Sequence, residues 1–244
     1  MNKWIYLLLL NAILCSGTAF AESVLTIHVT AKAPLNTADR SGFLDLVSAE
    51  ALRRIGYRMA TVEHPAERGL KNVNAGIDDG EMSRIGGLSA IYPNIIQVPE
   101  TIIDWRFVVF SKKELSTDEG WDSLAGKEIA YLNGWKILEK TVPQSSHRIK
   151  VRTMEQLFSL LERDHTDFII YEYWGGIHYL ESHSLDSIKV RTPPLIVKPM
   201  YMYLNQKHQQ LVPQLAAALR QMKQDGTYQR LSDQTLGQLN AVGD

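Results

Sequence analysis

The stretch from Pro65 to Arg84 places charged side chains just after a short amphipathic segment. Pro65 suits a first helical turn and Gly76 suits the left-handed residue that ends a helix, so we expect a helix between them. A strand that begins near Ile77 would then carry, at its exit, Asp79, Glu81 and Arg84. Because the carboxyl ends of strands form the ligand crevice of α/β domains, this cluster predicts a binding cleft. The alternative is a solvated turn with a surface ion pair.

The common catalytic motifs are absent from the sequence. It contains no Gly-x-Ser-x-Gly elbow, no Gly-x-Gly-x-x-Gly and no phosphate loop with Gly-Lys-Ser/Thr. His178 and His183 have a spacing that puts two imidazoles on different faces of a helix, so we expect surface histidines rather than a metal site. We therefore expect no enzyme, no cofactor and no bound metal.

Aromatic residues gather around the end of a predicted strand: Tyr171, Tyr173, Trp174 and Tyr179. Such side chains line pockets or pack between a helix and a sheet. We assign Trp174 and Tyr179 to packing and leave both roles open for Tyr171 and Tyr173.

The first residues of the chain predict export. A short positive start is followed by an almost wholly apolar run from Trp4 to Gly17, and a small-x-small site ends at Ala21. The apolar run is shorter than the ~20 residues that a membrane-spanning helix needs. Leu14 stands before Cys15 where a lipoprotein signal has a small residue, so a lipid anchor is disfavoured. We expect a soluble periplasmic protein, cleaved after Ala21.

Composition excludes some functions for the mature chain. Loss of Lys3 with residues 1–21 changes the 26 basic residues to 25 against 27 acidic ones, a net charge of about −2. This balance gives no basic face for nucleic acid. The only cysteine leaves with the signal, so the mature protein has no disulfide and depends on its core for stability.

Strand-like and helix-like patterns alternate along the mature chain, which predicts an α/β fold with parallel pairing. Strands are expected at 24–29, 57–62, 95–98, 105–110, 128–132, 149–151, 167–171, 188–190 and 198–204. The composition changes after Phe110, where a second strand and helix series begins. We expect one lobe from residues 22–108 and 198–244 and another from 109–197, with two joining strands near 107–110 and 194–198. The polar segment 31–41 should line the cleft.

Several sequence blocks follow one another in a characteristic order through nearly all of the mature chain: Gly42-Phe43 with a helix that ends at Arg54-Ile55-Gly56, the segment 68–79 with Gly-x-x-Asp, Trp121 to Lys127, Asp167 before a strand, and Leu219 to Thr227. This order resembles the bacterial extracellular solute-binding proteins of family 3, the amino-acid-type periplasmic binding proteins. The resemblance implies the type II fold, in which two lobes, each a doubly wound sheet with flanking helices, are joined by a two-stranded hinge.

The resemblance also implies ligand contacts. In the amino-acid binders, an acidic residue five places after the Asp that opens this strand holds the ligand's ammonium, and here that position is Glu172. This chain departs from the family pattern at two positions. Leu44 stands after Gly-Phe, where the family usually has an acidic residue. The family's carboxylate-binding Arg after a Thr/Ser-rich stretch is replaced by the segment Asp-Gly-Glu-x-x-Arg, which ends at Arg84. The sequence therefore looks like a proteobacterial variant of the family. The complete set of expected ligand contacts is Arg84, Glu172, Glu81, Asp79, Tyr171, Tyr173 and Trp135.

Three functions stay open from the sequence. The first is capture of a small polar ligand, an amino acid or related carboxylate, for an inner-membrane ABC permease. The second is presentation of a ligand to a sensor without any transporter. The third is an enzyme similar to the periplasmic dehydratases of the same fold, with Glu172 or Glu81 as proton donor. We favour the binding protein and expect it to be a monomer.

Overall fold

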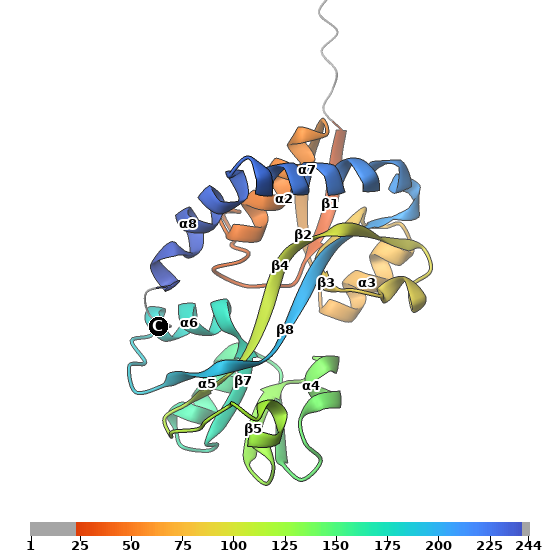
Figure 1. The fold of residues 1–244 in the computed structure, drawn as a ribbon. Coiled ribbons are helices and arrows are strands. Elements are labelled where there is room, and N and C mark those ends of the chain that lie inside the picture. The colour runs from red at the N-terminus through yellow and green to blue at the C-terminus, as the bar shows by residue number, and fades with distance from the viewer. Residues whose placement is uncertain (1–22, 241–244) are drawn as a thin grey trace, which may run out of the picture.

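The computed structural model describes residues 23–240, so the predicted signal peptide lies outside the described part of the chain. Two α/β lobes are joined by two long antiparallel strands, β4 (Ile95–Ser111) and β8 (Lys189–Asn205), which run through both of them (Figure 1). The predicted fold class, a two-lobed α/β protein with a two-stranded connection, is confirmed.

The strands form one hydrogen-bonded ladder in the order β2-β1-β3-β8-β4-β7-β5-β6. Parallel pairs join β1 to β2 and β3 in one lobe, and β5 to β6 and β7 in the other. The long strands link these two groups, because β8 pairs with β3 and β4 pairs with β7. The shorter strands are β1 (Ser23–Val29), β2 (Tyr57–Glu63), β3 (Gly80–Ile85), β5 (Glu128–Leu132), β6 (His147–Val151) and β7 (Phe168–Glu172).

Helices flank the sheet in both lobes (Figure 1). The β1–β3 lobe carries α2 (Phe43–Arg54), α3 (Ala66–Asn74), α7 (Val212–Gln224) and α8 (Thr227–Asn240), and the β5–β7 lobe carries α4 (Lys136–Thr141), α5 (Met154–Glu162) and α6 (Tyr173–Ser182). Short 3-10 helices occupy Leu88–Ala90, Gly120–Leu124 and Gln206–Leu211. Within residues 23–240, no helix is both long enough and apolar enough to span a bilayer.

Local sequence signals account for several helix boundaries. α2 buries Phe43, Val47 and Ala51, which recur at helical spacing. α3 ends before Gly76, whose φ of 77° is the left-handed conformation predicted there. At the start of α5, the hydroxyl oxygen of Thr153 accepts a 3.2 Å hydrogen bond from the backbone N–H of Gln156. The end of α3 and the start of α5 therefore lie where capping chemistry places them.

Two predictions about element boundaries were wrong. β3 begins at Gly80, and Ile77 is 69% exposed in the preceding turn, so Glu81 and Arg84 lie within the strand and not beyond it. The four strands expected at 95–110 and 188–204 are two continuous strands, β4 and β8. A further helix, α8, follows α7 directly after Gly226.

Candidate functional site

A buried row of polar side chains lies between the sheet and α3. Nδ1 of His28 lies 3.0 Å from Oε1 of Glu81, and Nε of Arg84 donates a 2.9 Å hydrogen bond to Oε2 of Glu81. Nη2 of Arg84 also lies 3.3 Å from Oε1 of Glu81 and donates to the carbonyl oxygen of Ala66 at 3.0 Å. The side chains of His28 and Glu81 are 0% and 1% exposed, whereas that of Arg84 is 15% exposed. The ion pair is therefore largely buried, unlike the surface ion pair of the alternative interpretation.

This row occupies a position where α/β sheets bind ligands. β1 lies between β2 and β3, so the chain passes from one side of β1 to the other after β2. His28 is one residue from the carboxyl end of β1, and Glu81 pairs with it directly in β3. The crevice at the carboxyl ends of strands, at such a change of direction, is the general ligand position in these sheets.

Asp79, predicted beside Arg84, belongs to a different set of contacts. Its carboxylate accepts hydrogen bonds from the backbone N–H of Thr26, from Nζ of Lys207 and from Nε2 of His208 at 2.7–2.8 Å. Burial raises the pKa of Asp79, but these hydrogen bonds outweigh burial and lower the pKa overall. Asp79 thus ties the middle of β1 to the segment after β8.

Glu172 ends β7 and caps α6. Its two carboxylate oxygens accept hydrogen bonds from the backbone N–H groups of Trp174, at 3.0 Å, and Gly175, at 2.9 Å. The residue is 3% exposed. Burial raises the pKa of Glu172 to about 7, although the two N–H groups and the charge of Arg106 oppose that shift. The predicted ammonium contact is therefore occupied by a helix N-terminus in this conformation.

The predicted aromatic contacts form a layer where β4, β7 and α4 meet. Trp135 stacks on Tyr171 with ring centroids 5.0 Å apart and also contacts Trp105 and Phe107. Burial raises the pKa of the Tyr171 phenol. Tyr173 is 5% exposed and receives the guanidinium of Arg106, 3.8 Å from its ring centroid. The indole Nε1 of Trp105 is buried without a hydrogen-bond partner among residues 23–240.

A pocket of about 620 Å³ is lined by both lobes. One wall is the segment after β1 with the end of β2, and the other is the first turn of α5 with the last turns of α6. The expectation that segment 31–41 lines a cleft agrees with this pocket. Charged and titratable groups line it on both sides: Lys32, Arg40, Asp45 and Glu63 on one, and Glu155, His178 and His183 on the other.

Hydrogen bonds within the segment after β1 fix the wall that this segment contributes to the pocket between the lobes. The buried carboxylate of Asp45 accepts hydrogen bonds from Nδ2 of Asn36, at 2.7 Å, and from the backbone N–H of Thr37, at 2.9 Å. Burial raises the pKa of Asp45, opposed by these hydrogen bonds. Lys32 pairs with Glu63 at the pocket's edge. These contacts hold this wall of the pocket in place.

His178 and His183 line this same pocket, so the prediction that they face apart was wrong. His183 lies beyond the last residue of α6, where the chain no longer follows the helical spacing. Its ring stacks on Tyr179 with centroids 3.9 Å apart. The charged residues after β1 were missed as individual contacts, because only the segment's polarity marked them in the sequence.

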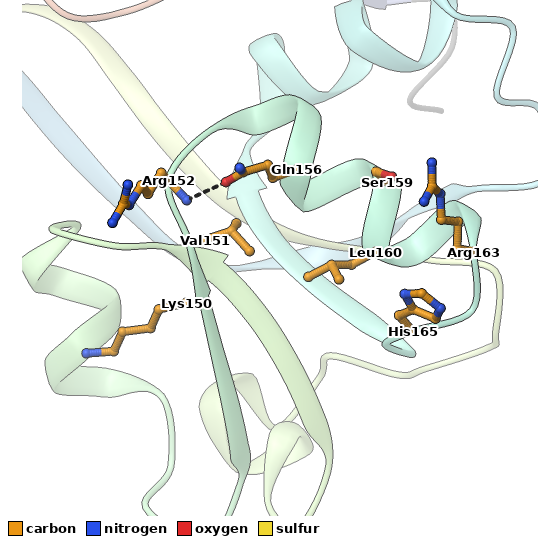
Figure 2. Close-up of a pocket in the computed structure, with 8 residues that line it drawn as sticks. All are labelled: Lys150, Val151, Arg152, Gln156, Ser159, Leu160, Arg163 and His165. Atoms are coloured by element: carbon orange, nitrogen blue, oxygen red, sulfur yellow. Dashed lines mark hydrogen bonds between the residues drawn. The ribbon is translucent and has the colours of Figure 1, made fainter.

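Neither Arg84 nor Glu172 lines the pocket between the lobes. A second pocket, of about 500 Å³, lies between β6 and α5 and is lined by Lys150, Arg152, Arg163 and His165 among others (Figure 2). Figure 2 shows Arg152 and Arg163 on opposite sides of this pocket, with side chains that point away from each other. This arrangement does not converge on a small anion, and β6 is an edge strand, where basic side chains commonly discourage pairing.

Comparisons of the sequence with known proteins give one relative and no family. No model of a protein family matches the chain. A relative described as an uncharacterized protein of Shewanella oneidensis is 26% identical over 207 residues, which cover 78% of this chain and 74% of the relative.

Solved structures give a clearer result. The P235GK mutant of ArgBP from T. maritima has a TM-score of 0.71 at 15% identity, covering 88% of this chain and 96% of that one. The GluR0 ligand-binding core in complex with L-glutamate has a TM-score of 0.76 at 12% identity, covering 88% and 99%. AncCDT-1, an ancestral amino acid-binding protein and a precursor of cyclohexadienyl dehydratase, has a TM-score of 0.69 at 14% identity, covering 87% and 95%. The chain therefore has the fold of the two-lobed amino-acid-binding proteins.

Proposed function

We propose that this chain is an exported binding protein that captures a small polar ligand between its two lobes. The observation that carries the proposal is the pocket of about 620 Å³, which takes its walls from both lobes. A ligand that contacts both walls favours the closed arrangement by its differential contacts. The fold shared with binding proteins of arginine and glutamate supports the same conclusion.

The lobes are proposed to divide near residues 108 and 198, as the sequence suggests. β3 meets β8 at Met200–Leu204, and β7 meets β4 at Phe107–Phe110, so the segment of the two long strands between these contacts carries no third strand. Bending there would disturb fewer hydrogen bonds than bending elsewhere in the ladder. This segment is the proposed hinge.

Among the predicted contacts, we propose that Arg84 and Trp135 reach the ligand when the lobes close, although neither lines the pocket between the lobes in this structure. Both keep exposed surface, whereas Tyr171, Tyr173, Glu81 and Glu172 are buried. Glu81 and Glu172 are proposed to act indirectly, through the contacts that they make with Arg84 and α6. Asp79 is proposed to be structural.

Delivery to an ABC permease and presentation to a sensor both remain compatible with this proposal, and we favour the permease. A permease and ATPase gene pair beside this gene would support transport. The dehydratase alternative has less support, because the carboxylate of Glu172 caps a helix and does not line the pocket between the lobes.

The test is a thermal-shift screen of residues 22–244 with amino acids, polyamines, small carboxylates, amides and polyols, followed by calorimetric titration of each hit. A ligand that binds only the folded state must raise the melting temperature. Small-angle scattering should show compaction on binding. Saturable binding without compaction would contradict capture between lobes, and turnover of a prephenate-like acid by the pure protein would establish an enzyme instead.

A further inference from the structure

The donors of Arg84 are mostly occupied inside the protein. Its Nε donates to Glu81, and its Nη2 donates both to Glu81 and to the carbonyl oxygen of Ala66. Nη1 has no hydrogen-bond partner among residues 23–240. A carboxylate is normally held by two N–H groups on neighbouring nitrogens of one guanidinium. With Nε and Nη2 engaged, Arg84 can offer a ligand only the two hydrogens of Nη1.

The charge of Arg84 is also compensated within the protein. The Glu81 carboxylate contacts the guanidinium at 2.9 Å in a site where its own side chain is 1% exposed, so solvent screens the pair weakly. An ionised ligand would therefore meet a neutral ion pair and would lose its hydration for little net attraction.

His28 holds Glu81 in this arrangement. A carboxylate only accepts hydrogen bonds, so Nδ1 of His28 carries the proton that lies between them. Nε2 lies 3.0 Å from the carbonyl oxygen of His64 and 3.1 Å from the backbone nitrogen of the same residue, so both sides of the ring are held. Gly69 leaves room for the ring, because a Cβ at this position would lie 2.0 Å from its Cε1. The ion pair is thus backed by a fixed donor.

The second charged contact that an amino acid would need is occupied too. Each oxygen of Glu172 accepts a backbone N–H of α6, and the residue is 3% exposed. Neither end of a zwitterion therefore meets a free, uncompensated partner at the two positions that the sequence suggested.

We propose that Arg84 is the anchor for an uncharged oxygen acceptor of the ligand, such as an amide carbonyl or a hydroxyl group, and not for an α-carboxylate. His28 and Glu81 are positioning residues that fix and neutralise its guanidinium. This inference rests on the proposed function and narrows the ligand to uncharged polar molecules at this end.

The test compares two probes of similar shape, acetamide and acetate, at constant ionic strength and pH 8. Residues 22–244 labelled with 15N-arginine give an Nε–H signal for Arg84, assigned by its loss in Arg84→Lys. Dissociation constants come from the titration curves at that signal. We expect acetamide to bind the wild type at least about tenfold more tightly than acetate, a difference of ~1.4 kcal/mol.

Glu81→Gln keeps the shape of the side chain and removes its charge, so acetate should then bind at least about tenfold more tightly than it does to the wild type. Glu50→Gln is the matched control, because Glu50 also pairs with arginine side chains, Arg53 and Arg54, but does so on α2. Glu50→Gln should leave the dissociation constants of acetamide and acetate at Arg84 within about twofold of the wild-type values.

Equal or tighter binding of acetate by the wild type would overturn the inference, as would no response of Arg84 to either probe. The wild-type titrations show whether Arg84 prefers an uncharged oxygen acceptor to a carboxylate even when Glu81→Gln fails to fold. These outcomes are separate from the ligand screen, because a ligand can stabilise the protein between its lobes without any contact to Arg84.

Discussion

The indole of Trp135 lies against the phenol ring of Tyr171, with ring centroids 5.0 Å apart and an angle of 22° between the planes. Trp135 precedes α4 and Tyr171 belongs to β7, so the contact joins a loop to the central strands of its lobe. Trp105 and Phe107 of β4 complete the layer at 5.9 and 5.7 Å from the same indole. The loop before α4 is therefore held in place mainly by ring contacts.

Trp135→Ala should lower the free energy of unfolding by about 2–3 kcal/mol, somewhat less than the ~3–5 kcal/mol typical of a fully buried Trp. Urea denaturation followed by circular dichroism measures the change. Trp121→Ala is the control, since Trp121 is also half-buried but has no ring contact with the rest of residues 23–240. An equal loss in both variants would show that the ring contacts add nothing to burial.

The strand and helix order followed from the sequence because apolar periodicity is a local signal. The two long strands were not predicted as continuous, because β4 contains one proline and β8 contains three, and proline interrupts a strand pattern. In β4, Pro99 lies where the register shifts between Gln97 and Thr101, and in β8 Pro193 and Pro194 lie opposite the shift between Phe107 and Val109. Bulges accommodate proline within a ladder, and the sequence does not show where a bulge will form.

The chemical character of the site was harder to predict than its position. Glu81 and Arg84 were both singled out from the sequence, but the contact of Glu81 with His28, 53 residues away, was not predicted. Glu172 was located through a family resemblance, whereas its use as the cap of α6 depends on backbone geometry. Partners distant in sequence and backbone donors leave no local pattern.

The protein should lose stability through Glu172 as the pH rises. Its pKa is raised from 4.5 to about 7 in the folded state, so the folded protein binds the proton more tightly than the unfolded chain does. The contribution is fully present below pH ~4.5 and is lost progressively up to pH ~7, by about 3 kcal/mol. Urea denaturation of the wild type and of Glu172→Gln across this range measures it. A pH dependence that is identical in the two proteins would refute this assignment.

Gly69→Ala should destabilise the protein, although alanine usually favours a helix. A Cβ at Gly69 would lie 2.0 Å from the His28 ring, which is fully buried and cannot move aside, so we expect a loss of about 1–3 kcal/mol. Gly237→Ala in α8 is the matched control. Its nearest contact would be 4.0 Å away, so it should gain about 0.5–1 kcal/mol. Stabilisation by both changes would mean that His28 is not held as the structure indicates.

Ser182→Trp should block ligand capture without unfolding the protein. Ser182 is exposed on the last turn of α6 and lines the pocket between the lobes, so an indole there would occupy part of its 620 Å³. The thermal shift caused by a hit from the ligand screen should disappear, while the melting temperature without ligand should change little, as is usual for surface substitutions. Calorimetry should show the dissociation constant of the same hit rising at least about tenfold, equivalent to ~1.4 kcal/mol.

The control for Ser182→Trp is Ser159→Trp, which makes the same substitution in the outer pocket between β6 and α5 and should leave the affinity within about twofold. Unchanged affinity in both variants would show that the ligand does not bind in the pocket between the lobes.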